Sequence, residues 1–228
     1  MAQIKTKEQI NKIKKACGIT DAIFTKLLRQ DLKSMTEIEL RDFILYQIKI
    51  RKLKPSFKPI VTSGEKAGNE IHPQSTSSIL SGFVIIDFGV VYEKYMSDMT
   101  RTIFIGTPTV EQEMLYNLIL RSELLGIVHS KAGIACASVD SVVRESLGKY
   151  KKYFIHMLGH GVGTKIHEGP RLYYKLTKPK LKENMVITIE PGIYIKNKLG
   201  IRIEDTCLIT NKACVALTKS PKELIIFK

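Results

Sequence analysis

The 228-residue sequence has no tryptophan and no CxxC pair. It also has no apolar run as long as the roughly 18 residues that a membrane-spanning helix needs. Its first residues, MAQIKTKEQI, lack the apolar segment of a signal peptide. The four cysteines, Cys17, Cys136, Cys207 and Cys214, are scattered, which is typical of buried thiols in a reducing compartment. These absences predict a globular, soluble, cytoplasmic protein with no membrane segment.

Acidic residues are also comparatively few. The chain has 36 Lys+Arg against 22 Asp+Glu, a net charge of +14, which invites a nucleic-acid interpretation. The basic residues are dispersed, however, through KEQINKIKK, KIRKLK and KLTKPKLKE, and the sequence contains no RRM or zinc-finger pattern. We therefore expect a basic surface that attracts polyanions weakly and no dedicated nucleic-acid site.

One stretch of the chain occurs twice in diverged form, over residues 83–106 and 185–210, and we call these the first and second acidic hairpins. Each copy carries an acid followed two residues later by glycine, then an acid followed two residues later by threonine. The acids are Asp87 and Asp98 in the first copy, 11 residues apart, and Glu190 and Glu204 in the second, 14 residues apart. The difference predicts a longer tip in the second hairpin.

Acids at the ends of Ile/Val runs are costly to desolvate without a cation, a donor or a proton. Four such carboxylates would repel one another unless positive charge lay between them. They predict a divalent metal site with one or two ions, and their oxygen donors suit manganese, magnesium or iron better than a thiolate-bound zinc. The alternative is that the acids lie at unrelated strand ends, exposed or paired with Lys and Arg.

Two helices are expected before each hairpin. Capping boxes place the first two helices over residues 6–30 (Thr6 with Gln9) and from Thr36 (with Glu39), followed by a strand over residues 59–63 and a loop that carries His72. A third helix begins at Thr109 (with Gln112) and carries Met114, Leu118, Ile119, Leu125 and Val128. A fourth runs from Ser138, with Val139, Val142, Val143 and Leu147, to near Gly148.

The repeated order of two helices and an acidic hairpin predicts one α+β domain over residues 1–228, an internal duplication with halves at about 1–107 and 108–228. A break into two independent domains near Pro108 is less favoured, because each half alone holds only half of the acids.

Histidines concentrate between the fourth helix and the second acidic hairpin. The run HMLGHGVGTKIHEGP holds His156, His160 and His167, and only His129 lies outside this run and the His72 loop. Three imidazoles within twelve residues, among glycines that permit close approach, favour a site over three unrelated histidines. A phosphate cradle is disfavoured, since GHGVG lacks a GKS/GKT ending and GxGxxG spacing before a helix.

These motifs resemble the pita-bread metallopeptidases, which include methionine aminopeptidase, aminopeptidase P and prolidase. The motifs are DFGxxYxxYxSDxTRT, HxxGHGxGxxxHExP, EPGxY and RxED, and the resemblance extends from the first helix to about Thr210. It implies the pita-bread fold and a dinuclear metal site. The implied ligands are Asp87, Asp98, His160, Glu190 and Glu204, with Asp98 and Glu204 as bridges.

The resemblance further implies that a metal-bridging hydroxide attacks the scissile carbonyl, with Glu190 as general base. It implies that His72, His156 and His167 line the substrate side and take part in catalysis, and that Tyr194 of EPGxY contacts substrate. Arg202 and Thr100 would hold the ligand carboxylates in place without contacting the metal themselves. The implied cofactors are two divalent ions, Mn²⁺ foremost, with Co²⁺, Fe²⁺ or Zn²⁺ as alternatives.

His156 favours one branch of this family. HxxGHG is similar to aminopeptidase P and prolidase, as is SDMTRT, whereas methionine aminopeptidases usually have another residue at that position. The implied substrate is a peptide with proline in second position, cut before the proline, a tertiary amide bond.

Three alternatives remain open: a methionine aminopeptidase, which the chain resembles in size; a non-catalytic pita-bread binding module; and a hydrolase of a small C–N bond, such as that of creatine. Aminopeptidase P and prolidase usually have a domain before the catalytic one that helps to build the oligomer. The chain is therefore expected to be the catalytic domain only, and a homodimer stays open.

Overall fold

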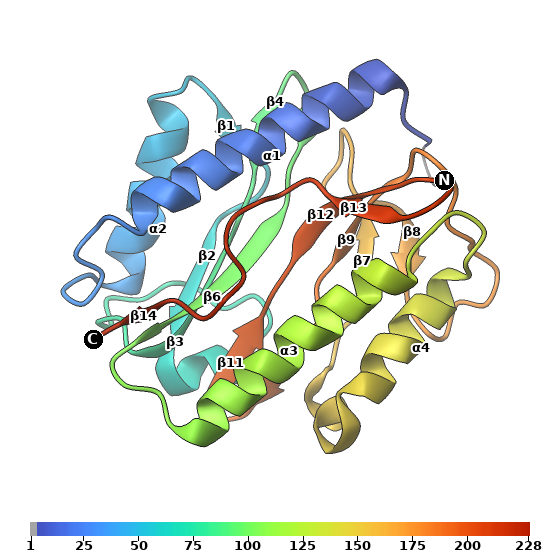
Figure 1. The fold of residues 1–228 in the computed structure, drawn as a ribbon. Helices are drawn as coiled ribbons and strands as arrows, with labels where there is room; N and C mark the ends of the chain where they lie inside the picture. The colour runs from blue at the N-terminus through green and yellow to red at the C-terminus, as the bar shows by residue number, and fades with distance from the viewer. Residues whose placement is uncertain (1–3) are drawn as a thin grey trace.

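The computed structural model describes residues 4–228, so the first three residues of MAQIKTKEQI lie outside the described residues. It shows a mixed α/β fold in which the same order of elements occurs twice (Figure 1). The first half contains α1 (Lys7–Leu27), α2 (Glu37–Lys49), β1 (Lys54–Pro55), β2 (Ile60–Ser63), η1 (Gly64–Gly68), β3 (Gly82–Phe88), β4 (Val90–Tyr92), β5 (Tyr95–Met96) and β6 (Met99–Ile105). The second contains α3 (Val110–His129), α4 (Cys136–Ser146), η2 (Gly148–Tyr153), β7 (Gly159–Gly161), β8 (Glu168–Leu172), β9 (Val186–Ile189), β10 (Gly192–Ile195), β11 (Leu199–Arg202), β12 (Asp205–Ile209), β13 (Cys214–Ala216) and β14 (Ile226–Phe227).

The predicted capping boxes are confirmed at all three helices. The hydroxyls of Thr6, Thr36 and Thr109 each accept the backbone N–H three residues on, and the third-position side chain bonds back. The fourth helix begins at Cys136, two residues before the predicted Ser138. The Cys136 N–H donates to the Pro179 carbonyl at 2.9 Å, so a neighbouring loop supplies the partner that a side-chain cap would otherwise provide.

Both acidic hairpins form as predicted. In the first, β3 pairs antiparallel with β6, with Asp87 opposite Thr100, inside a sheet of order β14-β6-β3-β2. In the second, β9 pairs antiparallel with β12, inside a sheet of order β13-β12-β9-β7-β8. Each tip is itself a small hairpin, β4–β5 in the first copy and the longer β10–β11 in the second. The extra residues of the second copy therefore lie in its tip, as the acid spacing predicts.

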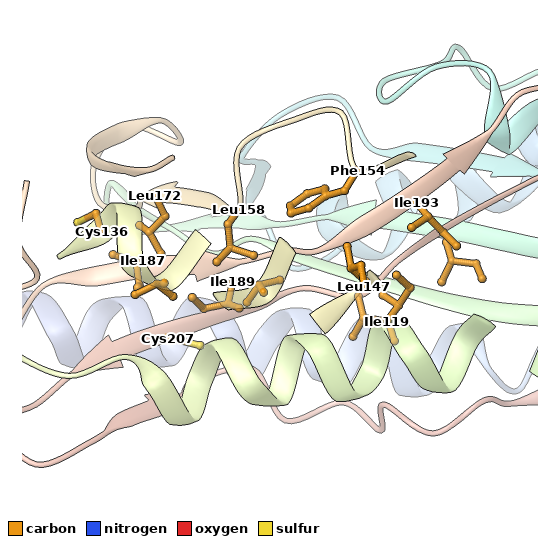
Figure 2. Close-up of a cluster of buried hydrophobic side chains, with 14 of the residues drawn as sticks. Ile119, Cys136, Leu147, Phe154, Leu158, Leu172, Ile187, Ile189, Ile193 and Cys207 are labelled. Carbon is orange, nitrogen blue, oxygen red and sulfur yellow. The ribbon is translucent and has the colours of Figure 1, made fainter. Parts of the chain in front are cut away.

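The helices pack mainly on the sheets of their own half, although Ile13 and Cys17 of α1 also pack against Val162 and Val186 of the second half. Figure 1 shows α1 and α2 beside β1, β2 and β4, and α3 and α4 beside the second-half strands. Figure 2 shows a core cluster to which α3 contributes Ile119, α4 contributes Cys136, and β9 contributes Ile187 and Ile189. Among residues 4–228, no helix combines the length and the apolar character needed to cross a membrane.

The buried face of the third helix only partly matches its predicted apolar stripe, since Ile119 is buried as predicted. Met114, Leu125 and Val128 are 46%, 37% and 81% exposed, whereas the buried face includes Glu123 and Gly126. A Cβ atom at Gly126 would lie only 2.9 Å from Ile189 Cγ2, so glycine allows α3 to approach β9 closely. Glu123 is paired with Lys222 at 2.8 Å. Close packing and a buried ion pair, rather than the largest apolar side chains, determine which face is buried.

Candidate metal centre

A cavity of about 160 Å³ lies where the two acidic hairpins meet. Its lining includes all five side chains predicted as metal ligands and the three histidines predicted to line the substrate side. The lining residues are Phe57, Ile71, His72, Asp87, Asp98, His156, Met157, His160, Ile166, His167, Glu190 and Glu204. The alternative of four acids at unrelated strand ends is therefore wrong.

The repeated threonines join the two halves beside this cavity. Thr100 Oγ1 donates to Glu204 Oε2 at 2.7 Å, and Thr206 Oγ1 donates to the Asp98 carbonyl at 2.7 Å. The Glu204 N–H also donates to the Thr100 carbonyl at 3.1 Å. The acid-x-threonine spacing thus places each half's threonine on the other half's acid, which brings the two strand pairs into contact.

Three of the side chains form a compact donor cluster. One ligand atom from each of Asp98, His160 and Glu204 lies within 4.8 Å of the others, and all three residues are buried. His160 Nε2 is 3.6 Å from Asp98 Oδ2 and 3.3 Å from Glu190 Oε1. His160 Nδ1 lies 3.1 Å from the Gly161 carbonyl, which can only accept, so Nδ1 carries the proton and the Nε2 lone pair faces the acids.

The acids are in an environment that disfavours their charge. Burial raises the pKa of Glu190 to about 8, and burial together with neighbouring carboxylates raises the pKa values of Asp98 and Glu204 well above the usual range. Burial, followed by the nearby His167, lowers the pKa of His160 to about 4. These shifts favour the uncharged forms of Asp98, Glu190, Glu204 and His160.

The donor set fits a hard divalent cation. Oxygens predominate over one neutral imidazole nitrogen, which is the chemistry that suits manganese, magnesium or iron. Asp87 Oδ1 is buried and has no hydrogen-bond partner, although Asp87 Oδ2 accepts from Arg202 Nη2 at 2.6 Å. A buried carboxylate oxygen without a hydrogen-bond partner at the cavity wall is available to coordinate a cation.

Arg202, Tyr194 and His156 form a chain of hydrogen bonds that reaches the cavity at His156. Besides Asp87, Arg202 donates through Nε to Thr100 Oγ1 at 3.0 Å and through Nη1 to Tyr194 Oη at 2.7 Å. Tyr194 Oη lies 3.1 Å from His156 Nε2, and His156 Nδ1 is 2.7 Å from the Met157 carbonyl. Both ring nitrogens of His156 are therefore occupied, while burial, followed by the charge of Arg202, lowers its pKa to about 3.

The other two cavity histidines are less restrained. The His167 ring lies 4.4 Å from the His160 ring in an edge-on arrangement, and His72 lies in the loop after η1. Burial, followed by the charge of Arg202, lowers the pKa of His72. Within residues 4–228, neither His72 nor His167 has a hydrogen-bond partner for its ring nitrogens. Both can present an N–H to a bound molecule.

The sequence interpretation missed Thr188, Phe57 and Met157. Thr188 Oγ1 donates to Glu190 Oε1 at 3.0 Å and accepts the His160 N–H at 3.0 Å, so one hydroxyl orients two candidate ligands. Its position two residues before Glu190 was an available signal. Phe57 and Met157 line the cavity without any motif that marks them.

Known proteins with similar sequences and structures carry related names. An Xaa-Pro dipeptidase from Pyrococcus furiosus is 41% identical over 97% of this chain and 65% of its own length. The structure of an Xaa-Pro dipeptidase from Bacillus anthracis matches with TM-score 0.94 and 37% identity over 98% of this chain and 64% of that one. The structure of an X-Pro aminopeptidase from Thermotoga maritima matches with TM-score 0.93 and 33% identity, covering 99% of this chain and 65% of that one.

The chain thus spans about 65% of the length of curated relatives that it matches. The shared fold is the pita-bread fold that the motifs predict. Residues 11–211 match Metallopeptidase family M24. On this match and on its resemblance to these peptidases, the chain belongs to metallopeptidase family M24.

Proposed function

We propose that this chain is a metal-dependent exopeptidase domain that hydrolyses the bond between an N-terminal residue and proline. One observation carries the proposal: a single cavity gathers Asp87, Asp98, His160, Glu190 and Glu204 together with His72 and His167. The names of its relatives, Xaa-Pro dipeptidase and X-Pro aminopeptidase, support the proline-directed branch.

We propose that the five clustered side chains hold two divalent ions. When bound, such ions supply positive charge that offsets the carboxylates, polarises a carbonyl and lowers the pKa of water. The chain's own contribution is to keep these acids buried together. Protons on these acids would be displaced on binding, because Asp98, Glu190 and Glu204 all have raised pKa values.

Glu190 is the proposed general base. Its carboxyl lies at the cavity wall, and Thr188 orients one of its oxygens. It would take a proton from the attacking water and pass it to the departing proline nitrogen. That nitrogen needs a proton to leave, because the tertiary amide before proline carries none of its own.

The histidines would divide the substrate-side roles. His72 and His167 have free ring nitrogens and would donate hydrogen bonds to the carbonyl oxygen as negative charge develops on it. His156, with both nitrogens occupied, would act through its ring surface, and Tyr194 would hold it in place. The catalytic role of His156 would then be narrower than the one that the resemblance implies, because its ring nitrogens would not contact the substrate.

A peptide panel tests the proposal. The Mn²⁺-loaded protein is incubated with Ala-Pro, Ala-Pro-Ala and Met-Ala-Ser, with and without a chelator. We expect metal-dependent release of alanine from the proline peptides, and loss of that activity in Glu190→Gln but not in Glu183→Gln, an exposed control in the same half. Release of methionine alone would favour a methionine aminopeptidase. No cleavage of any peptide would contradict the enzyme assignment and favour a binding module.

Several finer expectations stay predictions. These are manganese as the metal, a cytoplasmic location, a homodimer, and a single catalytic domain over residues 1–228 with pseudo-repeat halves. The panel also compares dipeptide with tripeptide, which separates a dipeptidase from an aminopeptidase.

A further inference from the structure

Arg144, in the last turn of α4, is fastened to the segment that delivers His156 to the cavity. Its Nη1 donates to the Phe154 carbonyl at 2.7 Å, and its Nη2 donates to the His156 carbonyl. One guanidinium group therefore binds the backbone on both sides of Ile155. The sequence interpretation gave Arg144 no role.

Its surroundings fix the guanidinium in this position. Arg144 Nε donates to Asp140 Oδ2 at 3.0 Å, one helical turn earlier. The guanidinium carbon lies 4.2 Å from the centre of the Phe154 ring and 4.8 Å from that of Tyr174. Asp140 also accepts the Tyr174 N–H at 2.7 Å. Both charged groups are thus held by several contacts at once, and the Arg144 side chain is only 11% exposed.

In the segment that Arg144 holds, Phe154 is buried in the core of the second half. Ile155 is 60% exposed and so contributes little buried surface at this point. Phe154 packs edge-on against the His156 ring, with the ring centres 4.9 Å apart. Arg144 therefore fixes both the backbone of His156 and the aromatic ring against which the imidazole rests. Arg144 itself does not line the cavity.

We propose that Arg144 is a positioning residue that acts through His156, an inference that rests on the proposed peptidase function. Lysine cannot replace it fully, because an ammonium lacks the planar fork that reaches two carbonyls while bonding an acid. Misplacement of a substrate-contacting group by about 1 Å can cost about 100-fold in rate. Loss of Arg144 should therefore lower peptide hydrolysis without changing metal binding.

A double-mutant cycle tests this inference. We expect Arg144→Met to lower kcat/KM for Ala-Pro by about 10- to 100-fold, and His156→Ala combined with Arg144→Met to lose no more than His156→Ala alone. Arg121→Met, an exposed arginine on α3 that bonds only the Asn117 carbonyl, is the matched control and should leave kcat/KM unchanged. Additive losses in the double variant would overturn the inference.

A second measurement does not depend on activity. In protein labelled with ¹⁵N-histidine, the His156 ring, assigned with His156→Ala, should show one Nδ1-protonated tautomer in the wild type and in Arg144→Met a shifted or averaged signal. Arg144→Lys keeps the charge and serves if Arg144→Met does not fold; it should show an intermediate change. An unchanged His156 signal in the variant that folds would overturn the inference. If the signal changes but the wild type cleaves no peptide, the proposed function fails while the positioning role stands.

Discussion

The two halves share an order of elements but contribute unequally to the cavity. Each supplies two carboxylates, yet the second half also supplies His156, His160 and His167, against His72 alone from the first. The second tip, β10–β11, is longer, and it carries Tyr194 and Arg202 to the first half's Asp87.

The halves are nevertheless bound by a reciprocal exchange. Arg202 of the second half pairs with Asp87 of the first at 2.6 Å, and Arg101 of the first pairs with Asp205 of the second at 2.7 Å. Only the Arg202 pair lies at the cavity, since Asp205 does not line it. Arg202 therefore stabilises an acid of the candidate metal site, whereas Arg101 stabilises the contact between the two halves.

The largest expected effect is at the centre of the donor cluster. Asp98→Asn removes a carboxylate that both halves surround, and should reduce bound Mn²⁺ and lower peptide hydrolysis by at least ~1,000-fold, more than the ~10- to 100-fold typical of residues behind the ligands. Metal stoichiometry by elemental analysis and initial rates check this. Asp42→Asn, whose side chain is 55% exposed, is the control. Full metal content with full activity in Asp98→Asn would remove Asp98 from the site.

The next largest expected effects distinguish Arg202 from Arg101, the two arginines that pair across the halves. Arg202→Met leaves the buried Asp87 without its cation, which should cost about 3–5 kcal/mol, measurable by chemical denaturation. Arg101→Met should cost less through Asp205, because Asp205 keeps its ion pair with Lys222 at 2.8 Å. Arg202→Met should also weaken Mn²⁺ binding, because Asp87 lines the cavity, whereas Arg101→Met should change it less. Equal losses of metal affinity in a titration would contradict the division of roles.

The pH dependence follows from groups with opposite shifts. Because burial raises the pKa of Glu190 from 4.5 to about 8, its contribution to stability is complete below pH 4.5 and is lost as pH rises through about 8. Because burial lowers the pKa values of His156 and His160 from 6.5 to about 3 and about 4, their contribution is complete above pH 6.5 and is lost as pH falls. Between pH 6.5 and 8 the histidine contribution no longer changes, and Glu123, whose pKa burial also raises to about 8, loses its contribution together with Glu190.

We therefore expect the chelator-treated protein to lose thermal stability from pH 6.5 to 8, and Mn²⁺ to raise the melting temperature more at pH 8 than at pH 6.5. Thermal shift measurements with MnCl₂ or chelator check this. A Mn²⁺ effect that is the same at both pH values would mean that the ion displaces no protons from the cluster.

Features of the structure that depend on local sequence patterns and motifs could be predicted from the sequence. The capping threonines, the two acidic hairpins and the five clustered side chains depend on spacing that can be read along the chain. The buried face of α3 could not be predicted in this way, because Glu123 pairs with Lys222, far along the chain, and Gly126 packs against Ile189 of β9 and Val143 of α4. Arg144 was missed for the same reason, since its partners Phe154 and Tyr174 come from later segments.

The smallest expected effect tests that exposed face of α3. Val128→Ala removes a side chain that is 81% exposed and should change the free energy of unfolding by less than about 0.5 kcal/mol. The same change at Val143 on α4, which is fully buried, should cost about 1–3 kcal/mol, because it leaves a cavity against the second-half core. Denaturant melts of the two variants provide the comparison. A large loss in Val128→Ala would show that something covers this face of α3 in solution, and so would restore the apolar stripe to the core that its periodicity suggests.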